Sequence, residues 1–327
     1  MRVFVTGGNG FIGSTVVARL VGSGHEVVCL LRRGSDTRRI DGLAIERALG
    51  DVRDAASVRE AIQSCTATIH LAAPGGWGAD DAALLHAVIE EGTRNVLDAA
   101  AAKRPPHRVV VVSSTAAVNA SDRPRVFDER SAFTIHDRRL HYAHAKHRAE
   151  LIASDMHARG VPVVVVNPAE VYGPGDTALG TARNLIDFLG SNPVLVCSGG
   201  TSIVHVDDVA SGIVAALDRG RAGERYILGG ENLTIRQLAQ LVLRLAGRRA
   251  RVLSIPNSLA RAGTRIAVRA GIPLPYEPSV VPYATRYWFM DSSKARRELG
   301  VTFRGAVDTL RSTLDWLASA IPSHIGA

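Results

Sequence analysis

A glycine-rich run near the amino terminus constrains this 327-residue chain more than any other feature. The run TGGNGFIG at 6–13 follows an apolar stretch and opens a helical pattern. Gly7 permits a tight turn, Gly10 lets the backbone approach a pyrophosphate without a Cβ in the way, and Gly13 allows the helix to pack closely on the strand. Phosphates would then meet free N–H groups at the helix N-terminus, where the helix dipole favours negative charge. The run therefore predicts a dinucleotide site, with contacts from Gly7, Asn9, Gly10, Phe11, Ile12 and Gly13.

Short apolar runs alternate with helical patterns over the first 118 residues. The expected strands are 2–6, 25–31, 44–49, 67–71 and 108–113, and the expected helices between them are 10–24, 54–64 and 80–102. Such βαβ alternation forces a parallel sheet with helices on both faces. We predict an α/β fold, a Rossmann doubly wound parallel sheet, with its ligand beyond the carboxyl ends of the strands. Further along, we expect a helix over 142–159, a sixth strand over 162–167, a return to the sheet at 202–206 and a helix over 207–217.

The regular alternation weakens in 173–200 and 230–327, which carry most of the prolines. Because proline cannot donate to a strand ladder, a Pro-rich region is not expected to supply central strands. We therefore expect these two segments to form a smaller, mainly helical C-terminal lobe that covers the substrate. Residues 1–172 and 201–229 would form the cofactor-binding Rossmann domain.

The charge balance is basic, with a formal net charge of +8 and a pI near 9.9. The arginines are scattered along the chain and not gathered on one helix, so no nucleic-acid partner is expected. No apolar run reaches the roughly 18 residues of a membrane helix and no cleavable leader pattern is visible, so we expect no membrane partner and a cytoplasmic location. The three cysteines lack the spacing of a zinc site or a redox pair. Only three residues are lysines, which makes a lysine beside a tyrosine informative.

The residues after the second and third strands bear on the choice of cofactor. NAD-selective sites usually place Asp or Glu after the second strand to accept from the ribose 2′-OH, whereas an arginine at that point can hold a 2′-phosphate. Here the acid is absent and Arg32 follows the second strand. Arg32, with Arg38 or Arg39, favours NADP over NAD, and solvated loop arginines are the alternative interpretation. Asp51 and Val52 are placed to accept from the adenine amino group and to cover the ring, although a plain helix N-cap is a competing role.

A tyrosine and a lysine four residues apart, Tyr142 and Lys146, share one helix face. A nearby ammonium favours the phenolate and would lower the pKa of Tyr142 from about 10 towards neutrality, which makes it a usable general acid or base. The same lysine can hold the nicotinamide ribose hydroxyls. The run SST at 113–115, just past the fifth strand, would present a hydroxyl to the substrate oxygen. Either Ser114 or Thr115 is the expected third catalytic residue, with Ser114 slightly favoured.

The chain resembles the extended short-chain dehydrogenase/reductases of the NAD-dependent epimerase/dehydratase family over nearly its whole length. The motifs that carry the resemblance are the glycine run, Asp51, HLAA at 70–73, GTRN at 92–95, Ser113 and Ser114, Tyr142 and Lys146, Asn167 and Pro168, and VHVDDV at 204–209. Within the family, the run at 224–234 is most similar to the hopanoid-associated sugar epimerases, neighbours of the dihydroflavonol reductases. The resemblance implies Tyr/Lys/Ser catalysis and a homodimer, 2′-phosphate contacts at Arg32 and Arg39, and further cofactor contacts at Ala72, Ala73, Pro168 and Val171.

Departures from the family pattern concern the substrate. Sugar-nucleotide enzymes often carry an arginine just before the HVxD stretch, where this chain has Ser202 and Ile203, so a nucleotide sugar is less expected. Dehydratases follow the catalytic threonine with Asp-Glu, whereas Ala116 and Ala117 follow Thr115, which argues against dehydration. Our leading hypothesis is an NADPH-dependent carbonyl reductase of a small molecule, with the pro-S hydride transferred. The alternatives are a sugar epimerase that retains NAD and a redox-sensing binding protein without catalysis.

Several other residues allow two interpretations. Histidines at 136, 141, 144 and 147 suggest a metal cluster, but no carboxylate is interleaved at ligand spacing and no metal is expected. Glu170 could face the substrate as an acid or base, or could be a hydrogen-bonded loop carboxylate. Trp77 could line the substrate pocket or pack locally. The aromatic residues Tyr283, Tyr287 and Trp288 could close the pocket, although core packing is the preferred interpretation.

Overall fold

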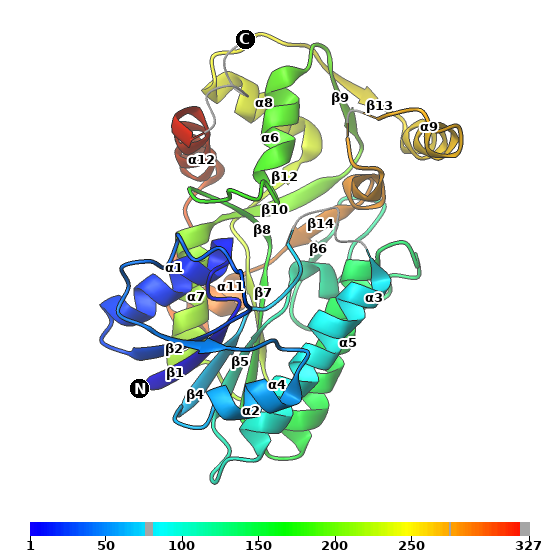
Figure 1. Ribbon diagram of the computed structural model, residues 1–327. Coiled ribbons are helices and arrows are strands. Elements are labelled where there is room, and N and C mark those ends of the chain that lie inside the picture. The colour runs from blue at the N-terminus through cyan, green and yellow to red at the C-terminus, as the bar shows by residue number, and fades with distance from the viewer. Residues whose placement is uncertain (76–80, 275, 321–327) are drawn as a thin grey trace.

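Two bodies of unequal size make up the molecule (Figure 1). The computed structural model describes residues 1–75, 81–274 and 276–320. The larger body is a sheet covered by helices on both faces, and the smaller body is a lobe above it (Figure 1). None of the helices in the described ranges combines the length and apolar character needed to cross a bilayer.

A seven-stranded parallel sheet forms the larger body. Its strands are β1 (Arg2–Thr6), β2 (Glu26–Leu31), β3 (Glu46–Leu49), β4 (Ala67–His70), β5 (Arg108–Val112), β7 (Val163–Pro168) and β11 (Arg225–Leu228), in the order β11-β7-β5-β4-β1-β2-β3. The strand order reverses between β1 and β4, which is the switch point where such sheets bind ligands. The predicted fold class is confirmed, and the predicted strands in the first 118 residues lie within two residues of these bounds.

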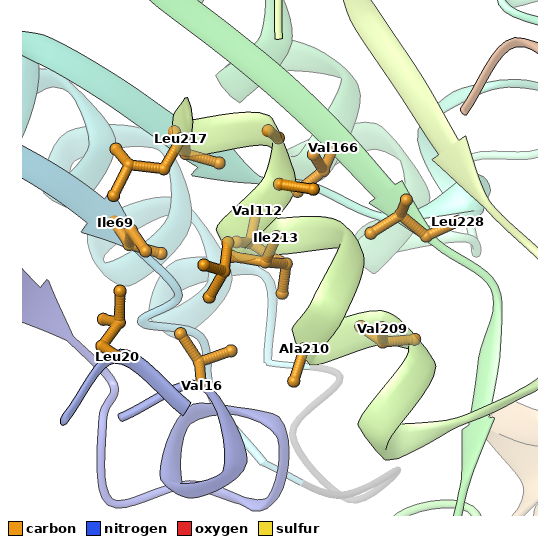
Figure 2. Close-up of a cluster of buried hydrophobic side chains, with 14 of the residues drawn as sticks. Val16, Leu20, Ile69, Val112, Val166, Val209, Ala210, Ile213, Leu217 and Leu228 are labelled. Atoms are coloured by element: carbon orange, nitrogen blue, oxygen red, sulfur yellow. The ribbon is translucent and has the colours of Figure 1, made fainter. Parts of the chain in front are cut away.

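Helices cover both faces of this sheet, as βαβ connections require. On one face lie α1 (Phe11–Gly22), α7 (Val206–Arg219) and α11 (Ser293–Leu299), and on the other lie α2 (Ala55–Ala61), α4 (Gly92–Ala101) and α5 (His141–Ala158). Figure 2 shows the first of these layers, where aliphatic side chains of α1 and α7 meet the valines and leucines of the strands. The single helix expected over 80–102 consists of α3 (Ala82–Leu85), a π-helical turn (His86–Glu91) and α4.

A second, five-stranded sheet joins the two bodies. Its strands are β6 (Val126–Phe127), β8 (Glu170–Tyr172), β10 (Gly200–His205), β12 (Glu231–Thr234) and β14 (Tyr287–Met290). The expected return of 202–206 to the parallel sheet is therefore wrong, because β10 pairs with β8, β12 and β14. All six residues of β10 are buried although Thr201, Ser202 and His205 are polar, and burial alone does not indicate the partner strand.

The smaller lobe mixes helices with strands. It contains α6 (Ala182–Gly190), α8 (Ile235–Leu245), α9 (Asn257–Arg269), α10 (Val281–Ala284), α12 (Ala306–Ala320), and a two-stranded parallel sheet of β9 (Val194–Cys197) and β13 (Val252–Ile255). Its core packs α6, α8 and α12 together. The proline-rich segment does supply an interior strand, since β14 lies between β10 and β6 in the second sheet, so the strand content of the lobe exceeds the expectation. The predicted domain boundaries stay a prediction.

Candidate active site

The glycine run lies between β1 and α1 at the switch point, as expected. Gly7 has φ +71°, and a Cβ there would lie 2.8 Å from the backbone nitrogen of Ala72. A Cβ on Gly13 would lie 2.0 Å from the Gly7 carbonyl oxygen, so this glycine lets α1 pack against the loop itself and not against the strand. A Cβ on Gly10 would meet only the Gly7 oxygen, at 3.3 Å. The outer side of the loop is thus open at Gly10, which fits a closely approaching pyrophosphate.

A buried histidine ties the loop to the neighbouring strand end. His70 Nδ1 and Thr6 Oγ1 are 2.7 Å apart, and His70 Nε2 lies 3.1 Å from Thr93 Oγ1 on α4. Burial lowers the pKa of His70 to about 3, with a smaller contribution from Lys146, so the imidazole is neutral. Ala72 donates its backbone N–H to Thr6 Oγ1 at 3.3 Å, which places the half-buried Ala72 beside the loop.

Of the arginines proposed to select the cofactor, Arg39 lies over the glycine loop. It donates to the Asn9 carbonyl at 3.4 Å and to the hydroxyl of Thr177, which follows β8. The Asn9 side chain in turn donates to the Asp36 carbonyl at 3.0 Å. Arg38, by contrast, is exposed and ion-paired to the Asp36 carboxylate at 2.7 Å. Arg39 is therefore the better placed of the two alternatives.

Asp51 forms an ion pair within the chain, whereas we expected it to accept from the adenine amino group. Its carboxylate is ion-paired with Arg53 at 2.7 Å, and Arg53 lowers the pKa of Asp51, with a smaller Coulombic contribution from the exposed Arg32. Val52 is buried, and its carbonyl accepts from Asn95 Nδ2 at 2.8 Å. The two residues lie at the carboxyl end of β3, where an adenine could reach them, but the carboxylate already has a cationic partner.

Tyr142, Lys146 and Ser114 come together at the carboxyl end of β5. The Ser114 hydroxyl lies close enough to the Tyr142 phenol to lower its pKa, and Ser114 Oγ accepts from the Ala116 N–H at 3.2 Å. Lys146 Nζ donates to the Val112 carbonyl at 2.9 Å and lies 5.8 Å from the centroid of the Tyr142 ring. Thr115 is buried in a short 3₁₀ turn, and its hydroxyl has no hydrogen-bond partner within the described part of the chain. The geometry pairs the phenol with Ser114 and not with Thr115.

Burial shifts the pKa values of Tyr142 and Lys146 in opposite directions, and the direction for Tyr142 differs from the one predicted from the sequence. It raises the pKa of Tyr142 to about 12, although the hydrogen bond from Ser114 acts in the opposite direction. It lowers the pKa of Lys146 to about 8, opposed by the negative charge of Glu150. The expected lowering of the Tyr142 pKa by Lys146 is thus not found, because the loss of hydration around the phenolate dominates.

A buried polar network, which sequence reasoning missed, lies under this pair. The Glu150 carboxylate accepts from Ser113 Oγ and Asn167 Nδ2, each at 2.5 Å, and from Arg225 Nη1 at 3.2 Å. Asn167 also donates to the Ser114 carbonyl at 2.9 Å, which connects the network to the hydroxyl beside Tyr142. The available signal was that Glu150 follows Lys146 by four residues and so shares its helix face.

Glu170 is a hydrogen-bonded carboxylate. It accepts from the Tyr172 hydroxyl at 2.5 Å and from Asn184 Nδ2 at 3.0 Å, and burial raises its pKa. Val171 points to the opposite side of β8 and packs in the core of the large sheet, and the preceding Pro168 is also buried. The second of the two roles considered for Glu170 is the one that the structure supports.

The histidines lie apart from any metal-like arrangement. His144 Nε2 lies 3.1 Å from the Asp137 carbonyl, and the His147 ring stacks on Phe133 with centroids 4.1 Å apart. Among residues 1–75, 81–274 and 276–320, no three His, Cys, Asp or Glu side chains are grouped so as to hold a metal ion.

Aromatic residues of the C-terminal lobe pack in the same apolar region as Tyr142. Tyr283 and Trp288 stack with centroids 5.6 Å apart, and Trp288 Nε1 donates to the Tyr283 carbonyl at 3.0 Å. Trp288 belongs to an apolar cluster against which Tyr283 and Tyr142 both pack. Tyr287 instead packs edge-on against Phe289, and Trp77 lies outside the described residues.

Comparison with known proteins places these features in context. Residues 3–229 match the sequence profile of the NAD dependent epimerase/dehydratase family. The chain is 33% identical over 337 residues to the 4-hydroxy-2-methyl-3-oxo-4-farnesyl-3,4-dihydroquinoline-1-oxide ketoreductase of Stigmatella aurantiaca, covering all of this chain and 98% of the relative. It is 32% identical over 317 residues to sterol demethylase protein B of Methylococcus capsulatus, covering 92% and 93%.

Two further similarities extend this picture. The dihydroflavonol 4-reductase of Zea mays is 29% identical over 264 residues, which is 73% of each chain. The crystal structure of gox2253 superposes with a TM-score of 0.83 at 31% identity, covering 97% of this chain and 98% of the other.

Proposed function

Because the chain belongs to the NAD-dependent epimerase/dehydratase family and is an NAD(P)-dependent oxidoreductase of the extended short-chain dehydrogenase/reductase type, we propose that it reduces a small-molecule ketone with NADPH. The observation that carries this proposal is the contact of Ser114 with Tyr142 at the end of β5, with Lys146 one helical turn further on. Tyr142 is the proposed acid, Ser114 the proposed second donor to the substrate oxygen, and Lys146 the proposed positioning cation.

The protonation of Tyr142 suits the reductive direction. With its pKa raised to about 12, the phenol keeps its proton at any ordinary pH and can give it to the nascent alkoxide. The hydride for the carbonyl carbon would come from bound NADPH, which becomes NADP⁺. The ketone C=O bond becomes a CH–OH group, and the phenolate left behind is stabilised by the Lys146 ammonium and the Ser114 hydroxyl.

The preference for NADP is proposed from the residues around the adenosine end. Arg39 lies over the loop at Asn9 and Arg32 follows β2 without an acidic residue beside it. Guanidinium groups suit a 2′-phosphate, whereas a 2′-OH would call for a carboxylate. Gly7, Gly10 and Gly13 would hold the pyrophosphate, and Lys146 would hold the ribose next to the nicotinamide.

The substrate class is proposed from the apolar surroundings of Tyr142. Tyr283 and Trp288 belong to the same cluster as the phenol, and the ketoreductase of Stigmatella aurantiaca has a farnesyl-bearing ketone in its name. We therefore expect a hydrophobic ketone and not a sugar nucleotide. A homodimer and a cytoplasmic location stay predictions from the sequence.

The test is a cofactor and substrate panel with the Tyr142→Phe variant. The purified chain should oxidise NADPH stoichiometrically with a hydrophobic ketone, bind NADPH at least about tenfold more tightly than NADH, and lose about a thousandfold in kcat on Tyr142→Phe. NADPH binding, followed by fluorescence, should be unchanged in that variant. Interconversion of a sugar nucleotide without net change in external cofactor would instead establish an epimerase, and turnover that survives Tyr142→Phe would exclude the proposed acid.

A further inference from the structure

The basic charge of the chain is concentrated in one segment of the C-terminal lobe. Residues 232–276 contain eight arginines, no lysine and no acidic residue, and the remainder of the chain has equal numbers of acidic and basic side chains. This segment therefore accounts for the whole formal charge of +8. It comprises α8, β13, α9 and their connections.

Four of these arginines line a concave site where α8 ends and β13 begins. The site has a volume of about 570 Å³, and its polar lining comes from Asn192, Gln240, Arg244, Arg248, Arg249 and Arg251. No carboxylate lines it, and within the described part of the chain Arg244, Arg249 and Arg251 have no ion-pair partner. Guanidinium forks that lack carboxylate partners are the groups that bind phosphate most readily.

Large aliphatic side chains are exposed beside these arginines. Leu195 on β9 and Leu253 on β13 stand opposite each other in register and are 58% and 47% exposed. On α9, which follows β13 directly, Leu259 and Ile266 are each 65% exposed. Exposed leucine and isoleucine side chains that gather at one end of a lobe mark an interaction surface.

Helix α9 is built to show these side chains outward. It buries only small residues, Ala260, Thr264 and Ala267. Leu259 and Ile266 are seven residues apart and therefore in line along the helix, and the exposed Arg269 lies beside them.

The helix is also held in place at the outer corner of the lobe. Asn257 at its start exchanges two hydrogen bonds with the backbone of Ser198, at 2.7 and 2.8 Å, which ties α9 to the end of β9. In Figure 1, α9 and β13 form the outer corner of the lobe, away from the large sheet.

We propose that this surface, consisting of the arginine-lined site, the outer faces of β9 and β13, and α9, docks on an anionic lipid bilayer. Lipid phosphates would occupy the arginine-lined site, and the leucine and isoleucine side chains would enter the boundary between headgroups and acyl chains. The excess of positive charge matches the negative potential of such a membrane, although Arg261 on α9 is paired with Asp122. A nucleic-acid partner would use the arginines but leaves the exposed Leu259 and Ile266 without a role.

Docking would bring the membrane close to the catalytic site, and this point rests on the proposed function. The connection from α9 leads through Tyr276, whose hydroxyl lies 2.8 Å from Thr264 Oγ1, to Tyr283 in the cluster against which Tyr142 packs. A hydrophobic ketone dissolved in the bilayer would thus reach the enzyme on the side where its apolar residues lie. The docking itself does not depend on catalysis and is tested separately.

Flotation of the full chain with lipid vesicles tests the docking. The protein should bind vesicles of phosphatidylcholine with about 30% phosphatidylglycerol and not vesicles of phosphatidylcholine alone, at about 0.1 M salt. A variant with Arg244, Arg248, Arg249 and Arg251 each changed to Gln should bind at least about tenfold more weakly. The double variant Leu259→Gln/Ile266→Gln should also bind about tenfold more weakly, because it removes the inserted side chains.

Matched controls separate this surface from charge and apolarity in general. Exposed arginines elsewhere in the chain, Arg59, Arg94, Arg138 and Arg311, changed together to Gln, remove the same charge and should leave vesicle binding unchanged. Val307→Gln on α12 removes an exposed aliphatic side chain elsewhere and should also have no effect. Thermal unfolding and NADPH binding of each variant verify that it is folded.

Three outcomes would overturn the proposal. Equal binding to neutral vesicles would show that anionic lipid is not required. An equal loss of vesicle binding in the control arginine variant would show that only the net charge of the chain matters. Tight binding of duplex DNA that displaces vesicles and is insensitive to Leu259→Gln/Ile266→Gln would assign the surface to nucleic acid. Ketone reduction by soluble substrate is expected to be intact in all these variants, so loss of docking and loss of catalysis can be told apart.

Discussion

At the scale of single residues, the hydroxyl that assists Tyr142 can be distinguished by mutation. Ser114 contacts the phenol, whereas the Thr115 hydroxyl has no hydrogen-bond partner within the described ranges. We expect Ser114→Ala to lower kcat for ketone reduction by about a hundredfold and Thr115→Val, which keeps the shape, to lower it less than about threefold. Steady-state kinetics with NADPH in excess measures both. The reverse order of effects would make Thr115 the assisting residue.

The pH dependence should report Lys146. Its pKa is lowered to about 8 by burial and raised by Glu150, so its charge is present below that pH and is lost above it. We expect kcat for reduction to fall as pH rises above about 8, and Glu150→Gln to move that fall to lower pH because the carboxylate no longer favours the ammonium. The neighbouring His70 does not obscure this, because burial lowers its pKa to about 3 and its imidazole stays neutral across the range. Glu60→Gln on the exposed side of α2 is the control, and an unmoved profile in Glu150→Gln would exclude the positioning role.

The site residues that could be predicted from the sequence are those whose arrangement depends on short spacings along the chain. Tyr142 and Lys146 stand four apart on one helix, and Ser114 follows a strand whose end is predictable. The network around Glu150 could not be found in the same way, since its partners come from β7, β11 and the end of β5, which only the tertiary fold brings together. The direction of the Tyr142 pKa was mistaken for a related reason, because burial is a property of the packed structure.

At the scale of elements, α1 contains two glycines with opposite roles. A Cβ on Gly13 would lie 2.0 Å from the Gly7 oxygen, whereas Gly22 at the end of the same helix has no atom within 4 Å of a Cβ position. Gly13→Ala should therefore displace the loop, cost about 2 kcal/mol of unfolding free energy and weaken NADPH binding by at least about tenfold. Gly22→Ala should stabilise the protein by about 0.5 kcal/mol and leave binding unchanged. Urea unfolding and NADPH titration measure both, and equal effects of the two changes would contradict this account of the loop.

The strands were predictable where the apolar pattern and the alternation with helices both indicate a buried parallel strand. The valine-rich strands β5 and β7 read directly as buried parallel strands, and their bounds agree closely with the prediction. Strand β10 was expected in the wrong sheet, and strand β14 was not expected at all. The pattern of a strand can indicate that it is buried but not which sheet it joins. The same limit explains the lobe, whose prolines lie outside the short strand Tyr287–Met290.

At the scale of the whole molecule, an ion pair joins segments 149 residues apart. Asp137 accepts from Arg286 at 3.0 Å, and both side chains are largely buried. Arg139 and, to a smaller extent, Arg286 hold the pKa of Asp137 below its usual value of 3.8. The stabilisation is thus complete above that pH and is lost as pH falls through the lowered value.

We expect Arg286→Ala to lower the unfolding free energy by about 2 kcal/mol at pH 6, and the difference from the natural chain to shrink below pH 4. Arg130→Ala is the control, because its pair with Asp128 involves an arginine that is 92% exposed and should contribute less than about 1 kcal/mol. Denaturant unfolding at both pH values measures the effect. A difference that grows on acidification would show that the pair does not act through the Asp137 carboxylate.

The distribution of charge is also a property of the whole molecule, and the positions of the arginines in the sequence do not reveal it. The arginines are indeed spread over the sequence, but the acidic residues that balance them are missing between 232 and 276. The positions of the cations alone do not reveal this segment, and the fold then adds the exposed Leu195 of β9, which lies outside it in sequence.

The position of β11 at the edge of the large sheet has a consequence for synthesis. Strand β7 ends at Pro168, but its outer neighbour comes only at Arg225–Leu228, after the chain has visited the other body and returned. While the ribosome is translating the intervening stretch, β7 leaves the exit tunnel with one edge of unpaired amides and carbonyls. The nascent chain is then open to pairing with a neighbour on the same polysome, and a chaperone that holds such edges would protect it until Leu228 emerges.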